Sequence, residues 1–262
     1  MLSGDRVTLL LAKVVLTPLF IAAVTLAGRR WGPAVGGWLA GLPLTSGPVS
    51  VFLALEQGPG FAARAAVGTL AGLVGVACFC VVYARLSRTR SWTLATAAGI
   101  AAYLAGAALL SRVPLALGPT AGGTVAVNLL AFRCLPIIRG ADGAPPAPRW
   151  DVPLRMAVAT ALVLLLTATA AVLGPKLSGL LSPFPVFATV LAVFTHRHAG
   201  AAATQQLLRG IVLGSFAFAG FFVVVAAALD RWEAAATYVV ACASALVINV
   251  ALRPLLASGR SQ

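Results

Sequence analysis

The chain has 262 residues, of which 60% are hydrophobic and 10% are charged. Soluble domains carry about 25% charged residues, so this composition excludes an ordinary water-soluble globular protein. The net charge of +13 would favour nucleic-acid binding in a soluble chain, but here the basic residues lie between apolar runs. Short basic loops between spans set membrane topology, so the expected partner is the lipid bilayer and no nucleic acid is expected.

The sequence predicts an all-α, polytopic integral membrane protein with about nine transmembrane helices, because apolar runs long enough to cross a bilayer recur along it. Charged residues, proline and glycine separate these runs. The fifth run is the least regular, since Pro119, Gly122 and Gly123 interrupt it and Asn128 lies within it. The predicted spans are residues 7–28, 35–55, 62–85, 91–111, 114–135, 153–173, 177–196, 204–229 and 234–253.

An odd number of spans places the two termini on opposite sides of the membrane. The 19 basic residues then divide into groups of 13 and 6, and the positive-inside rule puts the larger group in the cytoplasm. This predicts an outside N-terminus and a cytoplasmic C-terminus. Abundant alanine, glycine and arginine with only two lysines is typical of a GC-rich bacterial genome, so we expect the bacterial inner (plasma) membrane.

An internal repeat is predicted at an offset of 142 residues. Residues 12–90 share 16 identities in 79 positions with residues 154–232, and several identities are glycines or prolines, whose positions follow backbone geometry. Chance similarity from biased composition is the alternative explanation. The repeat predicts a first four-helix unit in residues 1–112, a connector helix with a Pro-rich cytoplasmic linker in 113–152, and a second four-helix unit in 153–262. Because the connector crosses the membrane, the second unit is expected to be inverted.

The run Gly-Leu-Leu-Ser-Pro-Phe-Pro-Val-Phe-Ala at 179–188, followed by His196 and Gly200, resembles the GlpM-like family of small bacterial inner-membrane proteins. The resemblance covers about residues 154–255 and, more faintly, 12–112. It implies that this chain is a fused, inverted pair of units that each match one such protein. The first unit departs from the pattern at 42–46, and the family implies no reaction or substrate.

The candidate substrate site lies in the two Pro-bearing spans. Gly41 to Pro48 holds helix breakers and hydroxyls within eight positions, and the matching part of the second unit holds Pro183 and Pro185. Broken helices in a membrane leave backbone groups that hydroxyls, water or a ligand must satisfy. A packing kink is the alternative. The predicted substrate-binding residues are Pro43, Thr45, Ser46, Pro48, Pro183, Pro185 and the intramembrane cation Lys13.

Proton coupling is predicted at His196, His198 and Glu56, because imidazoles and carboxylates can exchange protons. An ordinary basic boundary around Arg197 is the alternative. Glu56 aligns with His198 through the repeat, as Lys13 aligns with Arg155.

Small residues four apart at Gly68 and Gly72, and again at Gly210 and Gly214, predict close helix contacts between the units or between protomers of a homo-oligomer. No metal-ligand cluster, nucleophile motif or phosphate loop is found. Asp151 and four of the five other acids fall in predicted tails or loops. We therefore expect no enzyme, no cofactor and no metal.

These features favour a transporter or permease for a small solute, with its site between the Pro-bearing spans. The alternative is a non-transporting accessory subunit of an envelope assembly. Polar groups along a water-accessible path would favour transport, whereas dry packing would favour the accessory role.

Overall fold

The computed structural model describes residues 2–44, 46–138, 148, 150–162, 164 and 183–257. Within these ranges the chain forms helices and turns, and no strand is present. Five helices are long and apolar enough to cross a membrane. The all-α prediction is thus confirmed for the described part of the chain, while the count of nine spans stays a prediction.

Proline and glycine set several of the helix boundaries. Pro33 and Pro59 begin two helices, and proline is favourable there because an N–H at the first helical position has no partner inside the helix. Ser91 caps a third, its hydroxyl accepting a hydrogen bond from the Leu94 amide. Residues 151–162 are also helical. The labelled helices are α1 (Leu2–Trp31), α2 (Pro33–Ala40), α3 (Ser46–Gln57), α4 (Pro59–Leu86), α5 (Trp92–Leu110), α6 (Leu117–Cys134), α8 (Val186–Ala228), α9 (Ala234–Leu252) and α10 (Pro254–Ala257).

Three glycines with positive φ turn the chain sharply between helical segments. Gly32 (φ 97°), Gly58 (φ 89°) and Gly200 (φ 78°) adopt a conformation that other residues rarely reach. Gly32 separates α1 from α2, and Gly58 separates α3 from α4. Gly200 interrupts α8, so that α8 consists of two helical parts, 186–199 and 201–228.

Two predicted spans differ from the observed helices. The predicted span 35–55 is two shorter helices, α2 and α3, because the chain leaves the helical path after Ala40. The span predicted at 177–196 overlaps the first part of α8, which begins at Val186 and continues to residue 199, three residues beyond the predicted end. The predicted fifth span corresponds to α6, which carries Asn128 and Arg133 and is not among the five helices that are long and apolar enough to cross a membrane.

The helices carry apolar side chains on their outer faces. On α9, Val239, Leu246, Val247 and Val250 are each between 62% and 69% exposed. The opposite face of α9 buries the polar side chains of Thr237 and Asn249, and α6 likewise buries Thr124 and Asn128. Water would penalise such a surface, whereas lipid accommodates it. This distribution of side chains is compatible with a membrane location.

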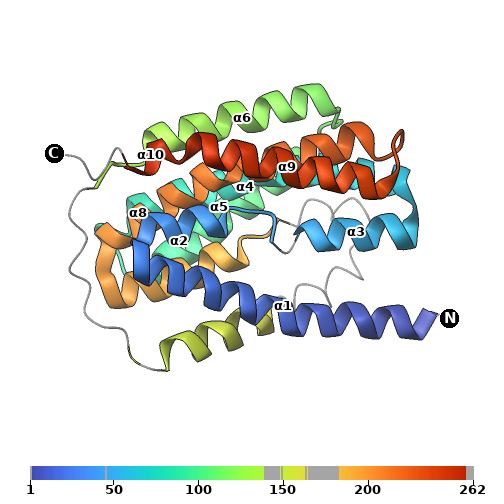
Figure 1. The fold of residues 1–262 in the computed structure, drawn as a ribbon. Helices are drawn as coiled ribbons and strands as arrows, with labels where there is room; N and C mark the ends of the chain where they lie inside the picture. Colours follow the sequence, from blue (N-terminus) through green and yellow to red (C-terminus); the bar gives the residue numbers. More distant parts are fainter. Residues whose placement is uncertain are drawn as a thin grey trace.

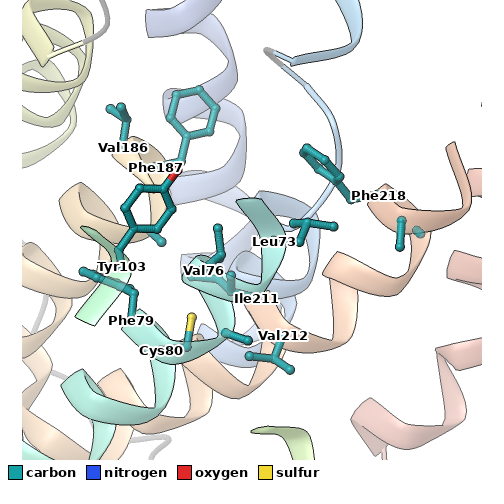
Figure 2. Packing of buried hydrophobic residues seen from close by; sticks show 14 of the residues in the cluster. Leu73, Val76, Phe79, Cys80, Tyr103, Val186, Phe187, Ile211, Val212 and Phe218 are labelled. Atoms are coloured by element: carbon teal, nitrogen blue, oxygen red, sulfur yellow. The ribbon is translucent and has the colours of Figure 1, made fainter. Parts of the chain in front are cut away.

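The helices form one bundle around α4 and α8, which are the most buried elements (Figure 1). Figure 2 shows Val76, Phe79 and Cys80 of α4 in one apolar cluster with Ile211 and Val212 of α8. In Figure 1, α1 begins at the right-hand end of the bundle and α10 lies at the left-hand end. α4 runs from right to left, and the second part of α8 runs from left to right.

Candidate functional site

The first helix break separates α2 from α3. After Ala40 the chain makes a tight turn in which the Leu44 amide donates to the Leu42 carbonyl at 2.8 Å. The Gly47 amide then donates to the Pro43 carbonyl at 2.9 Å, which starts α3. Because Pro43 has no N–H, α2 cannot continue regularly through this position. The break predicted around Pro43 is present.

Hydroxyl groups follow the first break along α3. Ser46 begins α3 and is 5% exposed, and Ser50, one turn later, is 4% exposed. The Ser50 hydroxyl lies 3.0 Å from the hydroxyl of Tyr238 on α9. Pro48 lies in the first turn of α3 and is half-buried, and the predicted residue Thr45 lies outside the described residues. The first break therefore leads into a buried polar contact between α3 and α9.

The Pro-bearing segment 183–185, called the second break because the sequence predicts an interrupted span there, repeats the hydrogen bonds of the first. The Val186 amide donates to the Phe184 carbonyl at 2.7 Å, and the Thr189 amide donates to the Pro185 carbonyl at 2.7 Å. These four residues are those that an offset of 142 pairs with Leu44, Leu42, Gly47 and Pro43. The two Pro-bearing segments thus enter the helix that follows them in the same way.

The second break is lined by apolar groups. Pro183 and Pro185 are buried, and the Phe184 ring lies edge-on against Tyr103 of α5, with 5.2 Å between the ring centroids. Thr189 on the first turn of α8 is 8% exposed, and its hydroxyl has no hydrogen-bond partner. An unpaired buried hydroxyl costs about 1–3 kcal/mol, so Thr189 is a polar group that a ligand or water could satisfy.

The two breaks border one hydrophobic core. Leu42 and Leu44 from the first, and Phe184 and Val186 from the second, belong to the same apolar cluster. Gly41 packs directly on α8, where an added Cβ would lie 2.6 Å from the Ile211 carbonyl oxygen. No hydrogen bond among the described residues joins one break to the other.

The glycine contacts predicted at Gly210 and Gly214 are present. A Cβ on Gly210 would collide with the carbonyl oxygen of Ala34, and one on Gly214 would collide with that of Trp38. The backbones of α2 and α8 therefore touch, which only glycine permits. Gly68 and Gly72 are buried on α4. The Gly210 and Gly214 contacts join the N-terminal and C-terminal halves of one chain.

Of the predicted proton-coupling residues, the structure describes the side chains of His196 and His198, which make different contacts. His196 stands against the Tyr83 ring, with 6.0 Å between centroids, whereas His198, two residues later, points elsewhere. The side chains of Glu56 and Lys13 lie outside the described residues, although both positions are helical, in α3 and α1. The structure therefore places one of these residues, His198, in a polar network, which is built around an acid that the sequence analysis set aside.

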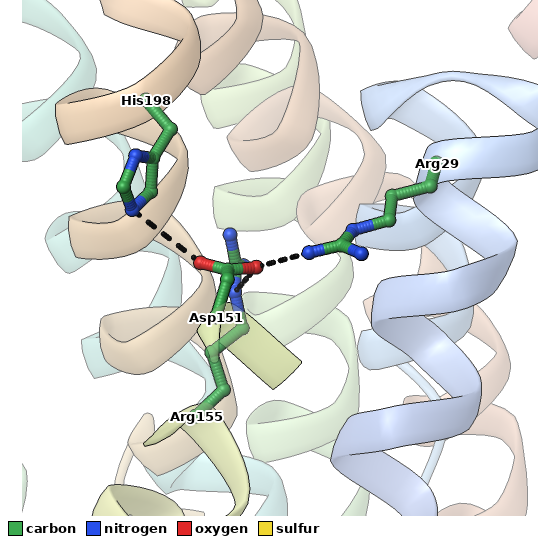
Figure 3. A network of polar contacts seen from close by, with 4 residues as sticks. All are labelled: Arg29, Asp151, Arg155 and His198. Carbon is green, nitrogen blue, oxygen red and sulfur yellow. Dashed lines mark hydrogen bonds and ion pairs between the residues drawn. The ribbon is translucent and has the colours of Figure 1, made fainter. Parts of the chain in front are cut away.

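That acid is Asp151, whose side chain is fully buried at the start of the helix 151–162 (Figure 3). One carboxylate oxygen accepts hydrogen bonds from Arg29 at 2.6 Å and from Arg155 at 2.9 Å. The other lies 3.5 Å from Nε2 of His198. The Arg155 guanidinium also lies over the Phe194 ring, 5.0 Å from its centroid. A buried carboxylate needs such partners, because an unpaired buried charge is strongly unfavourable.

The expectation that Asp151 lies in a loop is wrong. It follows a Pro-rich segment, and its burial depends on Arg29, which is 122 residues earlier in the chain. A local signal did exist: Asp151 and Arg155 are four apart, the spacing at which a helix pairs an acid with a base. The network ties the end of α1 to the helix 151–162 and to α8 near Gly200.

Comparisons with protein-family models, curated proteins and solved structures gave no match for this chain. The resemblance to the GlpM-like family stays a prediction. Among the described residues, no group of three His, Cys, Asp or Glu side chains is placed to hold a metal ion.

Proposed function

We propose that this protein is an integral membrane transporter for a small solute, built from two inverted four-helix repeats and a connector helix. Each repeat consists of one long span, one span interrupted at proline, and two further spans. The interrupted span of the first repeat is α2 followed by α3, and the connector is α6. This arrangement retains nine spans and places the two termini on opposite sides of the membrane.

Helix boundaries support the repeat. α4 covers 59–86 and the second part of α8 covers 201–228, so both ends differ by 142 residues. α5 covers 92–110 and α9 covers 234–252, again with both ends 142 apart. Gly58 and Gly200, also 142 apart, both have positive φ. Apolar composition alone gives no reason for turns and ends to coincide.

Inversion is supported by the direction of the helices. α4 and the second part of α8 run in opposite directions along the bundle (Figure 1). In many secondary transporters, inverted repeats place two interrupted helices around a site near the bilayer midplane. The inner-membrane location, the outside N-terminus and the cytoplasmic C-terminus belong to the same proposal, as do the absence of enzymatic activity and the inclusion in a GlpM-like family.

The observation that carries the transport proposal is the pair of Pro-bearing segments with matching hydrogen bonds, each followed by a buried hydroxyl residue. Ser46 follows the first break and Thr189 follows the second, one position further along the repeat. Interrupted helices at membrane depth are tolerated where they line a cavity or are buried in protein. A solute that accepts or donates hydrogen bonds would satisfy groups such as the Thr189 hydroxyl, which has no partner.

One observation favours the accessory role instead. At Gly41 the first break packs against the backbone of α8 without an intervening side chain, as expected for a rigid, dry interface. A membrane protein that only holds a partner needs such rigidity and no solute path. Transport and the accessory role therefore differ in whether the hydroxyls near the breaks have a function.

The test is solute uptake into proteoliposomes, screened across anionic, cationic and neutral solutes, with Thr189→Val as the variant. Valine has nearly the volume of threonine, and the lost hydroxyl has no partner, so folding should be unaffected. If Thr189 contacts the solute, uptake should fall about tenfold, the loss of roughly one hydrogen bond.

Thr25→Val is the matched control, because Thr25 on α1 is also buried with an unpaired hydroxyl and belongs to neither Pro-bearing segment. Its uptake should equal that of the wild type. Equal uptake by Thr189→Val and Thr25→Val would show that Thr189, after the second break, is not part of the solute site. If the wild type moves none of the solutes, the accessory role is favoured.

A further inference from the structure

A groove of about 710 Å³ runs between α6 and α9 on the surface of α8. α6 and α9 each pack against α8, and the groove lies between α6 and the last residue of α9, Leu252, beside α10. Apolar side chains from all four helices line it, among them Leu129, Leu213, Phe216, Leu252 and Leu255. None of the predicted site residues lines this groove.

Arg209 supplies a fixed positive charge at the groove. One of its guanidinium nitrogens donates to the carbonyl oxygens of Phe132 at 2.6 Å and Leu135 at 2.7 Å, the unpaired end of α6. The guanidinium also lies on the Phe132 ring, 3.8 Å from its centroid. These contacts hold the group in place but leave its charge unbalanced, because carbonyls and a ring carry no net charge.

A second arginine, Arg133, lines the same groove. It lies in the last turn of α6 and is exposed. No acidic residue lines the groove, and among the described residues the recorded ion pairs all involve Asp151 and none involves Arg133 or Arg209. The groove therefore combines a long apolar floor with two arginines that have no carboxylate partner.

We propose that this groove binds an anionic phospholipid, with its phosphate at Arg133 and Arg209 and an acyl chain along the apolar floor. Arginine is well suited to phosphate, since its planar donors match the oxygens of that group. Basic pockets between membrane helices on the cytoplasmic side bind anionic headgroups in this way. The site is separate from the helix breaks, so it does not depend on the transport proposal.

Exposure favours a lipid over a soluble solute as the occupant. The rim residues Leu129, Ile137 and Leu255 are 41%, 59% and 45% exposed, and the neighbouring outward-facing Leu130 is 63% exposed. The groove thus opens onto an apolar outer face, where acyl chains and not water are the surroundings. A water-soluble anion would have to leave its hydration shell to enter.

The test uses the full-length protein in a non-ionic detergent, to which phosphatidylglycerol, phosphatidylcholine or inorganic phosphate is added. The thermal unfolding midpoint is followed by tryptophan fluorescence, and native mass spectrometry counts retained lipid. A ligand that binds only the folded state raises the midpoint. Phosphatidylglycerol should raise it and remain bound, whereas phosphatidylcholine and inorganic phosphate should do neither.

Arg133→Gln should weaken phosphatidylglycerol binding about tenfold, the effect of removing a charge-assisted contact. Arg85→Gln is its control, because Arg85 is also exposed in the last turn of a helix, α4, and does not line the groove. Arg209 is left intact, since its contacts hold α6. Equal shifts with the two phospholipids, or equal weakening by the two arginine variants, would overturn the proposal.

A second pair of variants tests the apolar floor. Leu129→Trp places a bulky indole ring in the groove. Leu130→Trp, a change at the next residue, places the same ring on the outer face. The first should abolish retention of phosphatidylglycerol and the second should leave it unchanged. Retention of the lipid by Leu129→Trp would show that the acyl chain lies elsewhere and would overturn the site.

Discussion

The N-terminal and C-terminal halves of this chain are alike in backbone and unlike in polar groups. α4 and α5 have the lengths of the second part of α8 and of α9, and the tight turns after Leu42 and Phe184 carry the same hydrogen bonds. Yet position 151 holds a buried aspartate, whereas position 9, its counterpart 142 residues earlier, holds leucine. Glycine and proline therefore fix a similar backbone in both halves, while the polar side chains on that backbone differ.

The largest effect is expected for Asp151→Asn, which removes a buried charge that the first half lacks at the equivalent position. Arg155, whose side chain is 7% exposed, would keep its charge without a carboxylate. Breaking a buried ion pair by removing one partner costs about 3–5 kcal/mol. Denaturant titration in detergent micelles should show a loss of this size. Asp230→Asn, at an exposed acid, is the control, and equal effects of the two would deny the network a stabilising role.

A smaller loss is expected for Gly214→Ala, which tests the contact that joins the two halves. The new Cβ would collide with the Trp38 carbonyl oxygen, and α2 would have to move. Overpacking of this kind costs about 1–3 kcal/mol, measured by the same titration.

Gly122→Ala is the matched change in a helix, because a Cβ on Gly122 meets nothing within 4 Å. Alanine there should raise stability by about 0.5–1 kcal/mol, since it favours helix. If both glycine variants gained stability, α2 and α8 would not pack as described.

The smallest losses of stability are expected for two variants that test whether the turns of the two halves are equivalent. Gly58→Ala and Gly200→Ala each force alanine into positive φ, and each position has open space for a Cβ. Backbone strain is then the main cost, about 1–2 kcal/mol for each variant. Thermal unfolding should give similar losses for the two. A loss at one position with none at the other would break the equivalence of the two turns.

Local residues predicted much of this fold. Pro43 and Pro185 marked both breaks, because a missing N–H acts on the backbone whatever surrounds it. Charges and glycines likewise marked the ends of α4, α5 and α9 to within a few residues. The glycines at 210 and 214 predicted a close contact but not its partner, since spacing along one helix does not say which other helix packs there.

The Asp151 network could not be predicted in the same way. Its acid and one of its bases are neighbours on a helix, but Arg29 and His198 come from distant parts of the sequence. From hydropathy alone, Asp151 is a charged residue next to a Pro-rich segment and is predicted to be exposed to water. Only the packing of α1, α8 and the helix 151–162 removes it from solvent.

The glycine contact between α2 and α8 has a consequence for biosynthesis. Gly41 meets Gly214, a residue made 173 positions later. At ~5–20 residues per second, about 9 to 35 seconds pass between the synthesis of Gly41 and that of Gly214. During that interval α2 can pack on α1 through Gly36, but Gly37 and Gly41 still lack the α8 backbone that covers them in the folded chain. A chain whose synthesis stops between these two residues would therefore keep the Gly37 and Gly41 face of α2 uncovered.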